Sequence, residues 1–91
     1  KYIKLLLKMP IKLTREKLKE LLKLSNDNEL INKKSINLDN KNIESIDPLA
    51  FQDLNFLKEL ILKNNYIKTI STETFSNLKN LVVLDLSNNI I

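Results

Sequence analysis

The sequence repeats itself with a period of 24 residues. Residues 57–67 read LKELILKNNYI and residues 81–91 read LVVLDLSNNII, so leucine, asparagine and isoleucine recur at the same places in both stretches. A fixed period of this length is typical of proteins built from stacked, similar units. Such a stack has a long open surface rather than an enclosed active site, and that surface usually binds another molecule.

A third, less regular copy precedes these two. One period before the first clear copy, Ile36, Leu38 and Ile43 occupy the apolar motif positions, while Lys33 and Lys41 replace the leucine and the asparagine. Farther along the units, more apolar residues recur one period apart, namely Ile46 with Ile70, Phe51 with Phe75 and Leu54 with Leu78. Terminal repeats commonly depart from the motif in this way.

The copies divide the chain into an N-terminal part, 1–32, and a repeat part, 33–91. The repeat part consists of units 33–56 and 57–80 and an incomplete unit, 81–91. Because the sequence stops within a unit, we expect it to belong to a longer chain with further repeats. The open apolar end of this unit also predicts self-association.

Each unit is predicted to open with a short strand, near 35–39, 59–63 and 83–87, because apolar and variable residues alternate there. Stacked strands of this kind form a parallel sheet. Phe51 and Phe75 are expected to stack on the opposite side of the units.

The second half of each unit is predicted to return through a helical turn. Asp47 and Pro48 suit the N-cap and the first position of a turn that extends to Leu54. Ser71 suits the cap of a similar turn through Ser76.

The N-terminal part has a different character. Thr14 precedes REKLKELLKL, in which Leu18, Leu21 and Leu22 share one face. This spacing predicts an amphipathic helix of about three turns that ends at the polar residues 25–28 and covers the first unit.

Residues 1–13 leave two alternatives open. Apolar residues alternate with lysines, which favours an extended, half-buried segment with Pro10 at an edge or a bend. The run Leu5-Leu6-Leu7 fits a short helix equally well.

The chain contains no cysteine, no histidine and no glycine. Thiol nucleophiles, imidazole acid–base chemistry, the usual zinc sites and glycine-rich phosphate loops are therefore excluded. We predict a binding protein rather than an enzyme, with no catalytic residues, no cofactor, no metal and no small-molecule substrate. Asparagine-rich clusters at 26–28, 40–42, 64–65 and 88–89 are expected to form the turns that glycine would otherwise form.

The compartment stays unknown from the sequence. The absence of cysteine and of an N-glycosylation acceptor favours a reducing compartment or a bacterial source. The sequence shows no signal peptide, and no apolar run reaches the roughly 18 residues that crossing a membrane requires.

Residues 33–91 resemble leucine-rich repeat proteins of the roughly 24-residue type, since the motif L-x-x-L-x-L-x-x-N-x-I is intact twice. The resemblance implies an α/β fold, a right-handed horseshoe-shaped solenoid with a parallel sheet on its concave face. The amphipathic helix at 15–24 then caps its N-terminal end. It also implies binding of a protein partner on the concave face. Relatives outside cells often carry cysteine-bearing caps, which this chain lacks, so an extracellular receptor role is not expected.

Asn65 and Asn89 stand where each unit must turn inside the stack. An amide both donates and accepts hydrogen bonds, so these residues are expected to satisfy buried backbone groups. Lys41 cannot do this in the first unit, and Asn40 or Asn42 is the expected substitute.

The predicted contact patch lies on the outward strand positions. Ile61 and Val83 are apolar where solvent favours polar groups, and Tyr66 adds an amphipathic ring of a kind enriched at interfaces. With its charged rim, the patch consists of Glu59, Ile61, Lys63, Tyr66, Val83 and Asp85. The competing interpretation is that isolated apolar residues on a sheet are ordinary.

A basic N-terminal segment supplies a second hypothesis. Residues 1–24 carry eight basic side chains against Glu16 and Glu20, a net charge of +6. Such a segment can bind an anionic membrane surface or a nucleic acid. The two glutamates and the lack of an aromatic residue between Thr14 and Leu24 favour a solvated capping helix instead.

Overall fold

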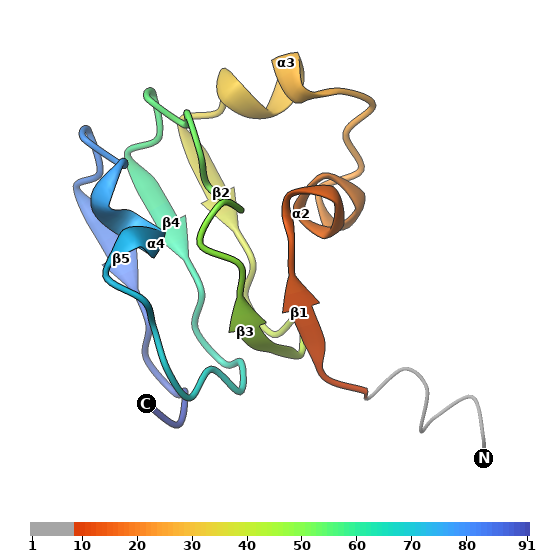
Figure 1. Ribbon diagram of the computed structural model, residues 1–91, viewed down its shortest axis with the longest axis vertical. Coiled ribbons are helices and arrows are strands. Elements are labelled where there is room, and N and C mark those ends of the chain that lie inside the picture. Colours follow the sequence, from red (N-terminus) through yellow and green to blue (C-terminus); the bar gives the residue numbers. More distant parts are fainter. Residues whose placement is uncertain (1–8) are drawn as a thin grey trace.

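Three strands, one from each repeat unit, form a parallel sheet in the order β2-β4-β5 (Figure 1). In the computed structural model, which describes residues 9–91, β2 spans Ser35–Asn37, β4 spans Glu59–Ile61 and β5 spans Val83–Asp85. Each residue pairs with the residue 24 positions later, as Ile36 does with Leu60. The strands begin where the period predicts and are shorter than expected.

A second, smaller sheet pairs the N-terminal part with the first unit. β1, Ile11–Leu13, lies parallel to β3, Ile43–Ile46, with an irregularity in register between Ile11 and Lys12. The later units continue this layer through single hydrogen bonds, from the N–H of Tyr66 to the Ile43 carbonyl at 2.8 Å, for example. The extended alternative therefore holds for residues 11–13, whereas the helical alternative at Leu5–Leu7 lies outside the described residues.

Asparagines make the turns at the carboxyl ends of the strands. Asn40, Asn64 and Asn88 adopt φ values of 56°, 59° and 56°, one period apart. This left-handed region suits glycine best, and asparagine is one of the residues that tolerates it most readily. A chain without glycine can therefore turn at the same place in every unit.

The return side of the units differs from the prediction in the first unit. α4, Glu73–Ser76, forms in the second unit, but its N-cap is Thr72, which makes no side-chain capping bond, and not Ser71. The Ser71 hydroxyl accepts from the Glu73 N–H at 3.3 Å from one position farther upstream. Residues 47–54 instead form consecutive turns, closed by bonds such as Ala50 N–H to the Asp47 carbonyl at 2.9 Å. The predicted helical turn is confirmed only in part: the Asp47 carboxylate accepts from the Leu49 N–H at 2.8 Å, as an N-cap does, but no regular helix follows. Asp53, with a left-handed φ of 64°, ends the turns before Leu54.

The N-terminal part contains two short helices rather than one of about three turns. α2, Arg15–Leu21, begins at Thr14, whose hydroxyl accepts from the Lys17 N–H at 3.1 Å. It stops early because Lys23 adopts a left-handed φ of 58°.

α3, Asp27–Ile31, was not predicted. Its N-cap is Asn26, whose side-chain oxygen accepts from the Glu29 N–H at 3.0 Å. The Glu29 carboxylate in turn accepts from the Ser25 N–H at 3.3 Å. The polar run that was expected to end one helix therefore starts the next, in an arrangement close to a capping box.

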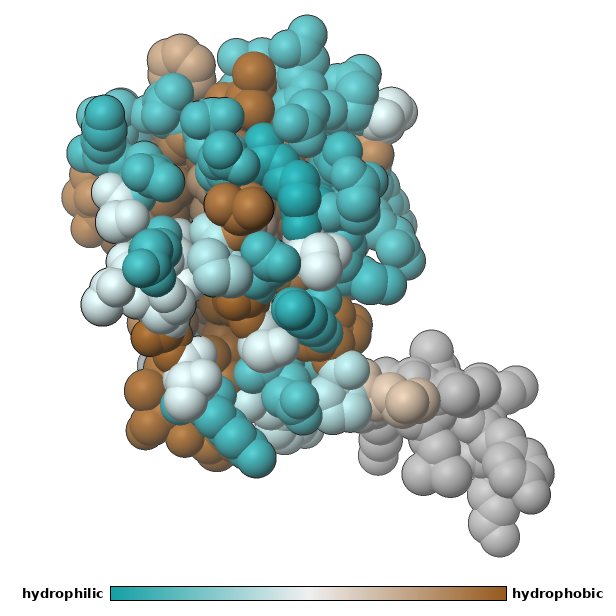
Figure 2. Space-filling view, in the orientation of Figure 1, coloured by the Kyte–Doolittle hydropathy of each residue, from teal (hydrophilic) through white to brown (hydrophobic). Residues whose placement is uncertain are grey.

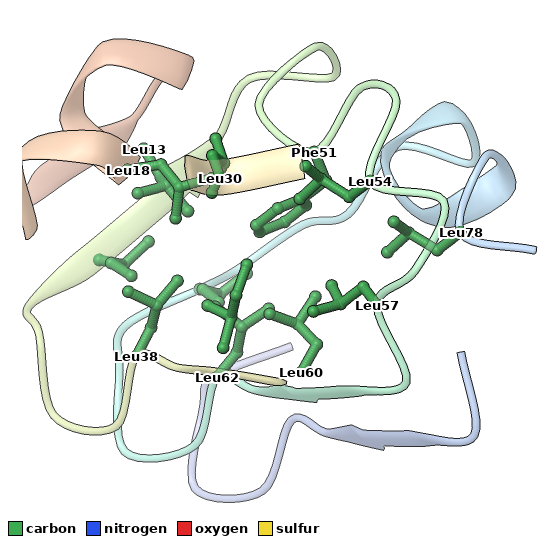
Figure 3. Packing of buried hydrophobic residues seen from close by; sticks show 13 residues of the cluster. Leu13, Leu18, Leu30, Leu38, Phe51, Leu54, Leu57, Leu60, Leu62 and Leu78 are labelled. Carbon is green, nitrogen blue, oxygen red and sulfur yellow. The ribbon is translucent and has the colours of Figure 1, made fainter. Parts of the chain in front are cut away.

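The core lies between the strands and the return turns (Figure 3). Leu60 and Leu62 from the second unit are completely buried, and Leu18 and Leu30 from the two helices join the same cluster. Each such side chain contributes about 1.5–3 kcal/mol through burial. Phe51 and Phe75 stack as predicted, with ring centroids 6.1 Å apart.

Apolar side chains are more exposed towards β5 and the C-terminal segment, whereas polar residues cover the surface over α2 and α3 (Figure 2). Leu84 is 38% exposed, although Leu60 at the equivalent position is completely buried. Ile91 is 66% exposed. The self-association of this end stays a prediction.

Asn65 satisfies buried backbone groups, as predicted. Asn65 is only 4% exposed. Its side-chain oxygen accepts from the N–H groups of Lys41 and Ile43, both at 3.0 Å. Its amide nitrogen donates to the carbonyls of Leu38 and Leu62, both at 2.9 Å. One amide thus joins the first unit to the second.

Asn89 repeats this arrangement one unit later. Its oxygen accepts from the Ile67 N–H, and its nitrogen donates to the carbonyls of Leu62 and Leu86, all at 3.0 Å.

The first unit has no equivalent amide, because a lysine, Lys41, stands at the asparagine position, and it is exposed. Asn42 does not substitute for it in the way that was expected. Its amide nitrogen donates instead to the Met9 carbonyl at 2.5 Å, next to the start of β1.

Arg15 attaches the helices to the first unit. Its Nε and Nη2 donate to the two carboxylate oxygens of Asp27, both at 3.2 Å. Its Nη1 donates to the carbonyls of Ala50 at 3.2 Å and Gln52 at 2.5 Å. The hydrogen bond from Arg15 is the main cause of a pKa of Asp27 below its ordinary value, and Lys19 adds to the effect.

Replacing Asn65 with alanine should lower the free energy of unfolding by about 3 kcal/mol, because several buried backbone groups lose their partner. Urea denaturation followed by circular dichroism measures this loss. Asn77→Ala is the matched control, since Asn77 is exposed. The control should change the free energy by less than about 0.5 kcal/mol. Equal losses in the two variants would contradict the role given to Asn65.

Acid should weaken the ion pair of Arg15 and Asp27, which helps to attach the two helices to the first unit. The pKa of Asp27 is lower in the folded chain than its ordinary value of 3.8. The stability that the pair contributes is therefore present above the ordinary value and is lost as the pH falls through the lower, folded value. The free energies of unfolding of wild type and Asp27→Asn should differ at neutral pH, and the difference should shrink as the pH falls below the ordinary value. A difference that does not change with pH would refute this account.

Candidate binding face

The outward side chains of β2, β4 and β5 form one surface, here called the outer sheet face. Along each strand the central residue points to the core and its neighbours point away from it, as Glu59 and Ile61 do on either side of Leu60. The register places Glu59 beside Val83 and Ile61 beside Asp85. Besides these four residues, the outer sheet face contains Ser35 and Asn37.

Two apolar side chains lie diagonally across neighbouring strands of this face. Ile61 is half-buried, and Val83 is 42% exposed. They are offset by two residue pairs in the register, with the pair of Leu60 and Leu84 between them, and Glu59 and Asp85 occupy the other two outward positions. Ile61 and Val83 together, here called the apolar step, therefore lie between the carboxylates of Glu59 and Asp85.

Polar side chains around this step bond to one another across the strands. The Ser35 hydroxyl donates to Oε1 of Glu59 at 2.8 Å. At the carboxyl ends of the strands, Nδ2 of Asn64 donates to Oδ1 of Asp39, and Nδ2 of Asn88 donates to Oδ1 of Asn64, both at 2.9 Å. These bonds fix the positions of the polar side chains around the apolar step, which are here called the polar frame: Ser35, Glu59, Asp39, Asn64 and Asn88.

Asp85 has a specific local partner. Its Oδ1 accepts from the Ser87 hydroxyl at 2.6 Å and from the Ser87 N–H at 3.0 Å. These two hydrogen bonds lower the pKa of Asp85, and the positive charge of Lys63 adds to the shift. Asp85 is therefore an anion at neutral pH.

Tyr66 lies apart from the other predicted contact residues. It follows the turn at Asn64 and Asn65, and its N–H donates to the carbonyl of Ile43 in the layer of β3. Its side chain is 54% exposed. Tyr66 flanks the carboxyl ends of the strands and does not belong to the outer sheet face.

The ladder from Asp39 through Asn64 to Asn88 was not predicted. The sequence shows that Asn40, Asn64 and Asn88 recur one period apart, but this recurrence predicts no hydrogen bonds among their side chains. Asp39 takes the first place in the ladder, and it is offset from Asn40 by one residue. The period alone therefore could not identify it.

The basic side chains of α2 are largely paired. Lys17 lies 3.2 Å from Glu20, and Lys19 lies 3.1 Å from Glu16 and 3.3 Å from Asp27. These contacts raise the pKa of Lys19, with Glu16 as the largest cause. Binding of an anionic membrane surface or a nucleic acid through the basic segment stays a prediction. Lys1, Lys4 and Lys8 lie outside the described residues.

Between residues 9 and 91, no three or more acidic side chains come together in a way that would hold a metal ion. Over the same range, no helix has the length and apolar character needed to cross a lipid bilayer. The preference for a reducing compartment or a bacterial source stays a prediction.

Comparisons with known proteins agree with the repeat seen in the sequence and the structure. Residues 32–91 match the family described as Leucine rich repeat. Podocan from Mus musculus is 45% identical over 56 residues, which cover 59% of this chain. The matched part makes up only 9% of Podocan, so the chain spans a small fraction of this relative. No solved structure gives a significant match.

Removing the Ser87 hydroxyl should raise the pKa of Asp85 towards its ordinary value of 3.8. The rise should be partial, because the Ser87 N–H still donates to the carboxylate. Titration of the Asp85 carboxyl carbon by NMR in Ser87→Ala measures it. Ser76→Ala is the control, since that hydroxyl donates to the Glu73 carbonyl in α4. An unchanged pKa in Ser87→Ala would show that the hydroxyl does not order Asp85.

Proposed function

Because the chain belongs to the leucine-rich repeat family, we propose that it binds a protein partner through the outer sheet face. Domains of this family generally mediate interactions between proteins. The observation that carries the proposal is the apolar step of Ile61 and Val83 on neighbouring strands, within an ordered polar frame. An exposed apolar group surrounded by polar groups is the usual composition of a protein interface.

The proposed contact residues are Glu59, Ile61, Lys63, Val83 and Asp85. Tyr66 adds a contact only with a partner that extends beyond the carboxyl ends of the strands. No catalytic step, cofactor or small-molecule substrate forms part of the proposal, since the face offers an open surface without a cluster of reactive groups.

We also propose that residues 33–91 form a right-handed solenoid whose concave side is the outer sheet face. Residues 9–32 would then act as its N-terminal cap. Leu18 and Leu30 support this proposal, because both are completely buried in the cluster that includes Leu38. Arg15 supports it as well, through its hydrogen bonds to the carbonyls of the first unit.

Val83→Asp should remove partner binding while the chain remains folded. Burying an unpaired carboxylate in an interface weakens binding by at least about tenfold. Affinity capture with wild-type and variant chains, followed by quantitative mass spectrometry, identifies the proteins that are lost. Ile90→Asp is the matched control. Ile90 is 54% exposed, but its N–H donates to the Ile67 carbonyl in the layer that continues from β3, so Ile90 does not belong to the outer sheet face.

The expected result is a set of proteins retained by wild type and Ile90→Asp and lost with Val83→Asp. Circular dichroism of each variant establishes that it is folded. If a folded Val83→Asp chain retains every protein that wild type retains, the outer sheet face is not the binding surface.

A further inference from the structure

A row of side chains crosses the repeat units outside the outer sheet face. Asn42, Tyr66 and Ile90 occupy the same place in successive units, 24 residues apart, and each precedes an isoleucine. The Tyr66 N–H donates to the Ile43 carbonyl at 2.8 Å, and the Ile90 N–H donates to the Ile67 carbonyl at 3.1 Å. The three residues therefore lie in neighbouring layers of the stack.

Met9 extends this row to the N-terminal part. Its carbonyl accepts from Nδ2 of Asn42 at 2.5 Å, and the Ile11 N–H donates to the Asn42 carbonyl at 2.8 Å. Met9, Asn42, Tyr66 and Ile90 are here called the lateral row. The row follows the side of the molecule on which β1 and β3 start and the chain reaches its C-terminal end (Figure 1).

The lateral row is mostly apolar and points to solvent. Met9 is 58% exposed, and Tyr66 and Ile90 are both 54% exposed, whereas Ile43 and Ile67 are completely buried. Tyr66 has a unit on either side of it and is as exposed as Ile90, so the exposure of both follows from their outward direction. Large apolar side chains that gather on a surface in this way mark an interaction site.

The spacing of the lateral row fits an α-helix laid along it. Neighbouring layers of paired strands lie about 4.8 Å apart. One face of a helix repeats every turn, at about 5.4 Å, so a helix is out of step by only about 2 Å after three layers. One face of an extended strand repeats at about 6.6 Å and is out of step by more than a whole layer over the same length.

The charges beside the lateral row favour an acidic helix. Within two residues of the row, the described charged side chains are Lys41, Glu44 and Lys68, and all three are exposed. Neither lysine forms an ion pair with a described carboxylate, and the chain as a whole has a net charge of +4. Carboxylates on the flanks of a partner helix would therefore be attracted to this surface.

An anionic lipid surface fits the lateral row less well. It would repel the carboxylate of Glu44, which lies among the same exposed side chains. It would also remove water from the Asn42 amide, which has only one hydrogen-bonding partner, the Met9 carbonyl, among the described residues. A helix can place a polar or small residue over Asn42 and apolar residues on either side of it.

We infer that the lateral row is a second interaction surface, which binds an amphipathic helix of a partner protein. The helix lies across the units, with apolar side chains from successive turns over Met9, Tyr66 and Ile90 and with acidic side chains beside them. Such helices are recognised through apolar residues spaced three or four positions apart. Because the lateral row is separate from the outer sheet face, the inference does not depend on the proposed function.

A display library of helix-forming peptides provides the probe. Each peptide has about 18 residues, a length at which helices become stable, and every position varies among alanine, leucine, glutamate and lysine, which all favour a helix. The library is selected on the immobilised wild-type chain and counter-selected on Ile90→Asp, so that peptides bound elsewhere are removed. The expected peptides carry leucines three or four positions apart and more glutamate than lysine.

Point variants locate the selected peptides. Tyr66→Ala removes an aromatic ring from the lateral row and should weaken them about tenfold. Lys68→Gln removes one flanking charge and should weaken them about twofold to threefold, whereas Glu44→Gln should not weaken them. Val82→Asp is the matched control for Ile90→Asp, since Val82 is 79% exposed and lies outside both surfaces. It should bind as wild type does, and circular dichroism establishes that each variant is folded.

Peptides whose leucines lack helical spacing, or in which lysine outnumbers glutamate, would overturn the inference. A selection that yields no peptide lost with folded Ile90→Asp would overturn it as well. Vesicles of phosphatidylserine and phosphatidylcholine that bind wild type but not Ile90→Asp, without any such peptide, would assign the lateral row to a lipid surface instead. The proposed function is unaffected by these outcomes, because Val83→Asp tests it separately.

Discussion

The buried amide of Asn65 is the interaction on which the rest of the structure depends. Each unit must turn inside the stack, and the turn leaves backbone N–H and carbonyl groups without strand partners. Only a side chain that both donates and accepts can satisfy them, and Asn65 bonds to both kinds of group. Because these groups belong to two units, the same amide fixes the second unit against the first. Asn89 extends the arrangement by one period.

The outer sheet face follows from this constraint. Once the turns are fixed one period apart, each strand lies against the next with its residues 24 positions apart in register. Glu59 must then lie beside Val83, and Ile61 beside Asp85. The residues that point outward are free to vary, since the fold depends on those that point inward. A binding surface can therefore change its chemistry without altering the buried amides and leucines.

The sequence was most informative where the period supplies several equivalent positions. The strands, the buried asparagines and the stacked phenylalanines were predicted because the same residue types recur in more than one unit. The errors concern features that one residue decides. Lys23 and Asp53 adopt left-handed backbone conformations that end a helix and a run of turns earlier than expected, and neither residue type signals this by itself. The position of Tyr66 and the ladder that begins at Asp39 depend on contacts between units, which spacing along one chain does not specify.

The first unit shows how the stack can begin without the amide. Lys41 stands at its asparagine position and is exposed, so no side chain there reaches back towards a preceding unit. β1 takes the place of that unit: the Ile11 N–H donates to the Asn42 carbonyl, and the Leu13 carbonyl accepts from the Asp47 N–H. Arg15 then satisfies two carbonyls of the return turns. The N-terminal part thus supplies, with a strand and a guanidinium, hydrogen bonds of the kind that a neighbouring unit would provide.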